Sequence, residues 1–162
     1  AGDVLSIDPA SLERNFQINT MALLHLVQAF GPGMVAAGNG VILATGNTAA
    51  YRGKANFVSF APTKAAQRIL LESAARLLGP QGVHVAHIVV DGAVDAPDTL
   101  GKMLGEERFQ QLRETRGGDL DGLLLPEEIA DTYYHLAHQH RSAWSFELDL
   151  RTFSDTAWWN HS

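Results

Sequence analysis

Two neighbouring stretches decide the fold of this chain: GVILATGNTAAYRG at residues 40–53 and FAPTKAA at residues 60–66. The first begins with a short apolar run, Val41 to Ala44, which predicts a buried strand. It continues as a polar loop from Thr45 to Asn56. The second stretch lies at the start of a helix predicted from about Ser59 to Leu78. A strand, a loop and a long helix in this order are typical of an α/β protein.

Helix and strand signals alternate along the rest of the chain. Asp8-Pro9 supplies a capping side chain and a first-turn proline, and the apolar periodicity that follows predicts a helix to about Ala37. Val83 to Val90 is almost wholly apolar, as expected of a buried parallel strand. Further helices are predicted for Asp98 to about Arg116 and Pro126 to about His138, and a last strand for Trp144 to Leu150. Strands separated by helices predict a parallel sheet.

The two stretches resemble the active-site segment of the short-chain dehydrogenase/reductase family. That family places a Ser thirteen residues before a Tyr, and a Lys four residues after the Tyr. Here the spacing is kept, with Asn47 at the Ser position, Phe60 at the Tyr position and Lys64 at the Lys position. The resemblance extends from about Ser6 to Phe153. It implies a Rossmann-like, three-layer α/β fold with a parallel sheet, of which this chain forms the C-terminal part of a doubly wound arrangement.

Two further motifs agree with the resemblance. FQINT at residues 16–20 resembles the helical motif that carries a fourth active-site residue, and the match places that residue at Asn19. DGAVDA at residues 91–96 resembles the segment that meets the nicotinamide, although Asp91 replaces a Pro and Ala96 replaces a Thr. The resemblance implies NAD or NADP as the cofactor. The cofactor-binding positions that it implies are Lys64, Gly92 and Val94.

The two replaced residues change the expected chemistry. The family's Tyr exchanges a proton while hydride moves, and a nearby Lys makes this possible for a phenol whose pKa is ~10. Phe60 has no ionisable proton and cannot serve as this acid or base. Asn47 can still donate a hydrogen bond to a substrate oxygen, as an oxyanion-hole amide does. Proton delivery is left to Lys64, to Tyr51 in the same loop, or to water.

Two functional hypotheses therefore stand side by side. The first is an NAD(P)-dependent oxidoreductase acting on a small or partly apolar carbonyl or alcohol, with impaired or unconventional activity. Its site would comprise Asn19, Asn47, Lys64 and Tyr51. The second is a catalytically degenerate member of the same family that acts as a ligand-binding or oligomerisation module. A retained fold does not by itself imply retained chemistry.

The sequence does not contain the nucleotide-binding unit with which the family begins. That unit is a strand, a Gly-rich turn and a helix N-terminus that holds the cofactor pyrophosphate. The nearest match, Gly31-Pro-Gly33, follows a helical pattern and predicts a turn instead. We therefore predict a single domain over residues 1–162, a partial Rossmann-like domain without the Gly-rich unit. The start at Ala1 without Met is what a missing upstream portion would give, and a real truncation of the protein is the alternative.

Composition limits the classes of partner. The net charge of −6 and the pI near 5.5 argue against a nucleic-acid surface and give no polybasic membrane patch. No apolar run of about 20 residues stands out as a membrane span, so no membrane association is predicted. There are no cysteines. No metal site is predicted, because His135, His138 and His140 are better explained as a solvated cluster at a helix end. A cytoplasmic location is the expectation.

The family resemblance also implies self-association. Its two long helices pack against those of a second subunit, so a homodimer or homotetramer is expected, with a small-molecule substrate as the other partner. The substrate pocket would be lined by the variable segment Asp98 to Leu125, whose Leu, Met and Phe content suggests a partly apolar ligand. The tail from Phe153 to Ser162, with Trp158 and Trp159, is interpreted as an interface or lid segment, or equally as a cover for the subunit's own core.

Overall fold

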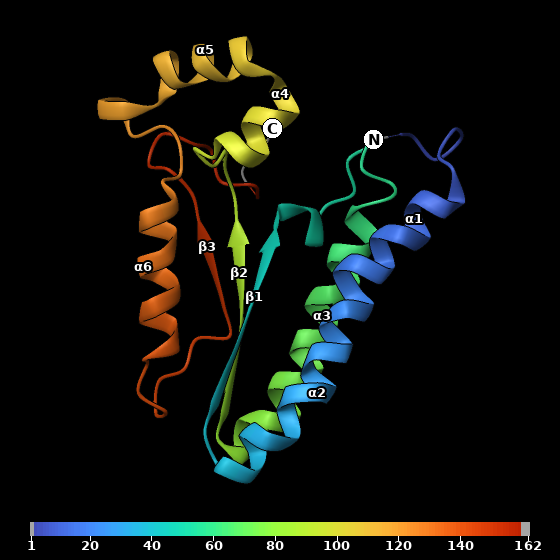
Figure 1. Cartoon of the computed structure of the whole chain (residues 1–162), viewed down its shortest axis with the longest axis vertical. Helices are drawn as coiled ribbons and strands as arrows, with labels where there is room; N and C mark the ends of the chain where they lie inside the picture. Colours follow the sequence, from blue (N-terminus) through green and yellow to red (C-terminus); the bar gives the residue numbers. More distant parts are fainter. Residues whose placement is uncertain (1, 160–162) are drawn as a thin grey trace. The chain divides into compact units, whose positions relative to one another are not determined.

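The computed structural model describes residues 2–159, and its centre is a parallel three-stranded sheet (Figure 1). The strands are β1 (Gly40–Asn47), β2 (Val83–Val90) and β3 (Glu147–Leu150), in the spatial order β1-β2-β3. β2 is central, and its side chains from Val83 to Val89 are buried, as the continuous apolar run requires. This architecture confirms the predicted Rossmann-like α/β fold. The three residues at the end of the predicted tail segment, 160–162, lie outside the described part of the chain.

The first predicted helix is present, but it is not uniform. It consists of α1 (Pro9–Phe16), a π-helical turn η1 (Gln17–Met21) and α2 (Ala22–Ala37). Asp8 caps it as expected, because its Oδ1 accepts the N–H of Ala10 at 3.1 Å. Gly38 ends it in the left-handed region, with φ of 62°. The π-helical turn was not predicted, because apolar periodicity does not reveal a one-residue insertion in a helix.

The second long helix, α3 (Ala61–Leu78), runs beside α2 in the same unit (Figure 1). Leu71 is fully buried on its inner face. The core that it shares with the sheet consists of Ala44, Leu71, Leu78, Val83 and Val85. Burial of this apolar surface is the main force that holds α3 in place. A short turn, η3 (Gly79–Gln81), then leads into β2.

The segment after β2 differs from the single helix predicted for residues 98–116. It contains η4 (Pro97–Gly101), the short α4 (Lys102–Leu104) and α5 (Glu106–Arg116). Gly105, with φ of 85°, interrupts the helix, because this backbone conformation is incompatible with a helix. A turn η5 (Gly118–Leu120) and helix α6 (Pro126–Ala137) follow.

The last strand is shorter than the predicted range, which began at Trp144. Trp144 instead stacks on His84, with ring centroids 4.9 Å apart, and donates from Nε1 to the carbonyl of Gln139 at 3.2 Å. Ladder pairing has nevertheless begun at Phe146, whose carbonyl accepts the N–H of His87 at 2.7 Å. Trp144, the first residue of the predicted strand, thus lies before β3 and is held by these side-chain contacts.

The chain divides into two compact units. One comprises the chain up to Val89 together with Leu136–Leu148, and the other comprises Val90–His135 and the chain from Asp149 onward. The first holds α1 to α3 and β1, and the second holds α4 and α5.

One helical stretch meets the length and composition expected of a membrane span, contrary to the sequence prediction. It is Pro9–Ala37, a run of 29 residues that is mostly exposed in the structure. The match rests on length and composition alone.

Candidate active site

The carboxyl end of β1 positions Asn47. Its backbone is extended, with φ of −156° and ψ of 178°, and its side chain caps the short turn η2 (Thr48–Ala50). The Oδ1 atom accepts the backbone N–H of Ala49 at 3.0 Å. The backbone N–H of Ala49 needs an acceptor, and the oxygen is the only acceptor of the Asn47 carboxamide, so this bond fixes the orientation of the carboxamide. The Nδ2 group of Asn47 is therefore the donor that remains to be offered to a ligand.

Asn47 and Phe60 line the same small cleft, which has a volume of about 120 Å³. The remaining lining residues are Thr48, Ala49, Arg52, Lys54 and Phe57. The structure thus brings together Asn47 and Phe60, the residues expected at the Ser and Tyr positions of the family pattern. Sequence reasoning missed Arg52 and Lys54. The sequence feature that could have indicated them is their position in the loop that follows Asn47, on either side of Gly53.

Lys64 lies one turn into α3 and reaches back to the sheet. Its Nζ donates to the carbonyl of Thr45 at 3.1 Å and to Oε1 of Gln67 at 3.0 Å. It also lies 5.8 Å from the centre of the Phe60 ring, within the range of a cation–π contact. Burial lowers the pKa of Lys64 from its ordinary value of 10.5. The ammonium group has three N–H donors, and the two acceptors use two of them, so one N–H remains for a ligand.

Asn19 lies in the π-helical turn η1 and is linked to the start of α3. Its Nδ2 donates to the carbonyl of Asn15 at 3.0 Å and to Oγ1 of Thr63 at 3.3 Å. Thr63 Oγ1 in turn donates to the carbonyl of Phe60 at 2.7 Å. Both amide hydrogens of Asn19 are thus engaged, and its Oδ1 is the group that could accept a bond. π-Helical turns are common at functional sites.

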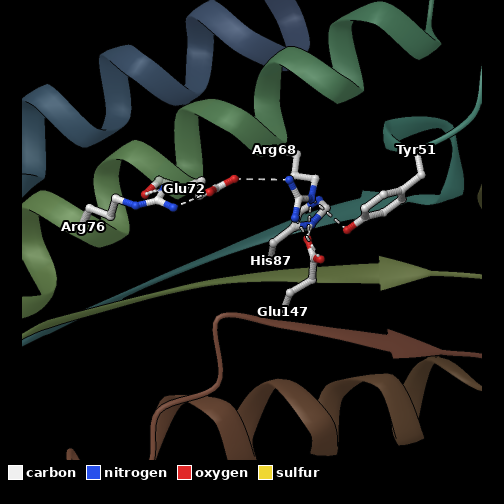
Figure 2. Close-up of polar contacts among 6 residues, drawn as sticks. All are labelled: Tyr51, Arg68, Glu72, Arg76, His87 and Glu147. Carbon is white, nitrogen blue, oxygen red and sulfur yellow. Dashed lines mark hydrogen bonds and ion pairs between the residues drawn. The ribbon is translucent and has the colours of Figure 1, made fainter.

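Tyr51 belongs to a second cluster, which Figure 2 shows around Glu147. Arg68 Nε donates to the Tyr51 hydroxyl at 3.0 Å and to Glu147 Oε2 at 2.8 Å. His87 Nδ1 bonds the same Oε2 at 2.8 Å. Burial raises the pKa of Tyr51, and its hydrogen bond to Glu147 acts in the same direction. This geometry suits an anchoring phenol better than a proton donor.

The protonation of this cluster follows from its contacts. Burial alone would raise the pKa of Glu147, but hydrogen bonds from Arg68, Tyr51 and His87 outweigh it and lower the pKa below 4.5. Because the ionised carboxylate only accepts, His87 must carry its hydrogen on Nδ1. Burial lowers the pKa of His87 below 6.5, despite the partner carboxylate. The fully buried ring is therefore neutral, and its Nε2 has no hydrogen-bond partner among residues 2–159.

Gly92 and Val94 lie in the other compact unit. Val94 forms a parallel bridge with Leu124, carried by the bonds from Leu124 N to Ala93 O and from Asp95 N to Leu124 O, both 2.8 Å. In such a bridge the N–H and C=O of Val94 point away from Leu124. A Cβ at Gly92 would lie 3.2 Å from Oδ2 of Asp155, so the backbone is closely packed there.

Asp91, the residue expected at the position of the family's Pro, is buried and holds the tail of the same unit. Its Oδ2 accepts the backbone N–H of Trp158 at 3.0 Å and lies 3.7 Å from Nη1 of Arg151. The Trp158 indole donates to Oδ2 of Asp149 at 3.2 Å, and the Arg151 guanidinium lies 4.5 Å from the centre of the Trp159 ring. The described part of the tail is therefore tied to its own unit. Within residues 2–159, no group of three or more acidic or histidine side chains is placed to hold a metal ion.

Comparison with known proteins identifies the family to which this chain belongs. The family model described as enoyl-(acyl carrier protein) reductase matches residues 1–145. The chain belongs to the short-chain dehydrogenase/reductase family, a family of oxidoreductases.

Individual relatives agree with this assignment. The chain is similar to the 7alpha-hydroxysteroid dehydrogenase of Escherichia coli (strain K12), with 32% identity over 122 residues, covering 75% of this chain and 46% of the relative. A short-chain dehydrogenase from Rhodopseudomonas palustris has 27% identity and a TM-score of 0.69, covering 92% of this chain and 55% of that chain. A metagenomic short-chain oxidoreductase in complex with NADP shares the fold, with 24% identity, a TM-score of 0.69 and coverage of 93% and 56%. The chain thus spans about half the length of the curated relatives that it matches.

Proposed function

We propose that this protein is an NAD(P)-dependent oxidoreductase that interconverts a partly apolar carbonyl compound and its alcohol without a tyrosine acid. The observation that carries this proposal is the position of Asn47, which lines the cleft together with Phe60 and whose Oδ1 is occupied by the N–H of Ala49, so that its Nδ2 is the group left to donate. A fixed amide donor is what a developing negative charge on a carbonyl oxygen requires. The similarity to a 7alpha-hydroxysteroid dehydrogenase supports an alcohol of this kind.

Lys64 is the group that we propose for proton delivery, directly or through a water molecule. Its lowered pKa brings the ammonium closer to the range in which general acids work. Its contact with the Phe60 ring supports this role, because Phe60 is the residue expected at the position of the family's Tyr. Tyr51 is the weaker candidate, because its hydroxyl is engaged by Arg68 and its pKa is raised.

The residues present fit a nicotinamide cofactor, which when bound supplies or accepts hydride. The remaining N–H of Lys64 can donate to a ribose hydroxyl. The carbonyl of Val94 already accepts the N–H of Ala96 at 2.8 Å, whereas its N–H faces away from Leu124 and can donate to a carboxamide. Gly92 lets the backbone approach closely. Asn19, through Oδ1, can hold a water molecule near the start of α3. The NADP complex of the metagenomic neighbour supports this choice of cofactor.

The alternative proposal is a degenerate family member that binds a ligand or assembles without turnover. Phe60, which carries no proton, favours it. So do the exposed apolar side chains on the two long helices, which repeat at intervals of four and eight residues and thus share faces. They are Ile18, Leu26, Phe30, Ile69 and Leu77. We propose that these faces bind a second copy of the chain, giving a homodimer or homotetramer.

Turnover by designed variants separates the two proposals. Reduced nicotinamide is mixed with a panel of apolar ketones and aldehydes, and its oxidation is followed by absorbance. For the oxidoreductase we expect slow turnover by the natural protein and faster turnover by Phe60→Tyr, because the added phenol lies beside Lys64. The absence of turnover in both proteins, together with a dimer in sedimentation analysis, favours the assembly module instead.

A further inference from the structure

Two cavities in the first compact unit adjoin each other beside Asn47. The smaller is the cleft of about 120 Å³ that contains Asn47 and Phe60, and the larger has a volume of about 510 Å³. Four lining residues are common to both cavities: Ala49, Arg52, Lys54 and Phe57. The two spaces therefore meet at a boundary formed by two cations and an aromatic ring.

The charge of this boundary is unlike that of the chain as a whole. The protein carries a net charge of −6, yet none of the residues that line the smaller cleft is acidic. The guanidinium of Arg52 is held in place, because its Nη2 donates to Oγ1 of Thr48 at 3.2 Å. The larger cavity has one acidic lining residue, Asp3, whose carboxylate accepts the N–H groups of Leu5 and Ser6 at 2.8 and 3.0 Å. The Asp3 carboxylate thus caps the local turn that contains Leu5 and Ser6.

The larger cavity is predominantly apolar. Most of its wall comes from the loop after β1 and from the first turns of α3. The apolar lining residues are Val4, Ala49, Ala50, Ala55, Phe57, Val58, Ala61, Pro62 and Ala65. Its volume lies within the range of typical small-molecule sites, ~300–1,000 Å³. An apolar wall with two cations at one end matches a ligand that has an apolar body and an anionic end.

We propose that this site binds an organic anion with an apolar body. Its carboxylate would lie between Arg52 and Lys54, and its apolar body would lie in the larger cavity. Arg52 presents a planar fork of donors that suits a carboxylate, and Lys54 adds a point charge beside it. Under the proposed function, on which this last step rests, the substrate is an oxo or hydroxy compound with an anionic group near the oxygen that Asn47 holds. The binding itself needs neither cofactor nor turnover.

Calorimetric titration of the purified protein with decanoate tests this inference. Decan-1-ol serves as the uncharged probe of equal chain length, and all titrations are made without nicotinamide. We expect decanoate to bind at least fivefold more tightly than decan-1-ol, and added salt to reduce the difference. Arg52→Gln and Lys54→Gln should each weaken decanoate binding about threefold to tenfold and leave decan-1-ol binding unchanged. Lys102→Gln, an exposed cation of the other unit, is the matched control and should change neither.

A second variant tests the apolar part of the site. Ala65→Leu fills part of the larger cavity, and should weaken decanoate without affecting acetate. Equal affinity for decanoate and decan-1-ol, or decanoate binding unchanged in both cation variants, would overturn the anion site. Inorganic phosphate binding as tightly as decanoate would overturn the apolar part. Because no cofactor is present, these results stand whether or not the oxidoreductase proposal holds.

Discussion

The imidazole of His87 packs directly against Gly46, so closely that a Cβ at position 46 would overlap its Nε2. The other ring nitrogen of His87 is bonded to Glu147 at 2.8 Å, which fixes the ring from the opposite side. Gly46 immediately precedes Asn47 on β1. The buried cluster of Figure 2 therefore supports the end of the strand that presents the proposed substrate-binding amide.

Gly46→Ala should destabilise the protein by about 1–3 kcal/mol, because the new methyl group forces the ring or the strand to shift. The free energy of unfolding in urea measures this loss. Gly53→Ala is the control, since no atom lies within 4 Å of a Cβ at that position. Adding His87→Ala to Gly46→Ala should recover part of the loss, and a purely additive double variant would contradict the proposed contact.

The protein should lose stability as the pH falls below 6.5, and His87 should account for part of the loss. Below that pH the unfolded chain protonates this histidine, whereas burial lowers its pKa in the folded state and keeps it neutral. The unfolded state then binds more protons than the folded state, so the free energy of unfolding decreases as the pH decreases. In His87→Gln, which keeps a donor to Glu147 but does not titrate, the loss between pH 7 and 5 should be smaller. The lowered pKa of Glu147 adds its own loss only nearer 4.5.

Asn47→Asp should preserve the fold and impair the proposed chemistry. An aspartate can still accept the N–H of Ala49, so the thermal midpoint should hardly change. It replaces the amide donor with a second acceptor, and kcat should fall by about 10²–10³-fold. Asn47→Ser introduces the residue that the family resemblance implies at this position, retains a donor and serves as the matched control. Equal rates for the two variants would mean that Asn47 does not hold the substrate oxygen.

The pH profile of turnover should report on Lys64. Burial lowers its pKa, so the alkaline decrease in kcat/KM should begin below the ordinary lysine value of 10.5. Lys64→Arg keeps a positive charge that does not titrate in this range and should remove that decrease, at a reduced rate. An unchanged alkaline limb in the arginine variant would assign proton delivery to another group.

Asp91→Ala should release the described tail. The amide hydrogen of Trp158 is bonded to the Asp91 carboxylate at 3.0 Å, and its exchange with deuterium should accelerate by about tenfold or more without that acceptor. Asp91→Asn keeps an acceptor and should show a smaller effect. The amide of Ile88 in β2 is the internal reference. Unaltered exchange at Trp158 would show that Asp91 does not hold the tail.

Much of the fold could be predicted from local patterns. The apolar run from Val83 to Val90 matched β2 at both ends, and the Asp8-Pro9 signal matched the start of α1. β1 extends beyond the predicted Val41–Ala44, because its polar end pairs in the sheet although its residues lack strand character. The helix break at Gly105 was missed, since an isolated glycine is tolerated in many helices.

Less of the candidate site could be predicted. The spacing of Asn47, Phe60 and Lys64 placed these residues at one site, and the structure brings the Lys64 ammonium to the Phe60 ring. The roles assigned to Asn19, Tyr51, Gly92 and Val94 remain predictions. The cluster around Glu147 includes the contact between Arg68 and Glu147, which lie 79 positions apart in sequence, and no local pattern reveals such a contact. Arg52 and Lys54 looked like ordinary loop cations until their shared cleft was visible.

Titration of the purified full-length protein with NADPH and NADH, followed by their fluorescence, tests the central claim most directly. The proposed oxidoreductase should bind one of them saturably, and Lys64→Met should weaken this binding by about tenfold, because a ribose-binding donor is lost. Saturable binding that depends on Lys64 supports the account. A folded protein that binds neither cofactor would contradict it and leave the binding or assembly module as the function.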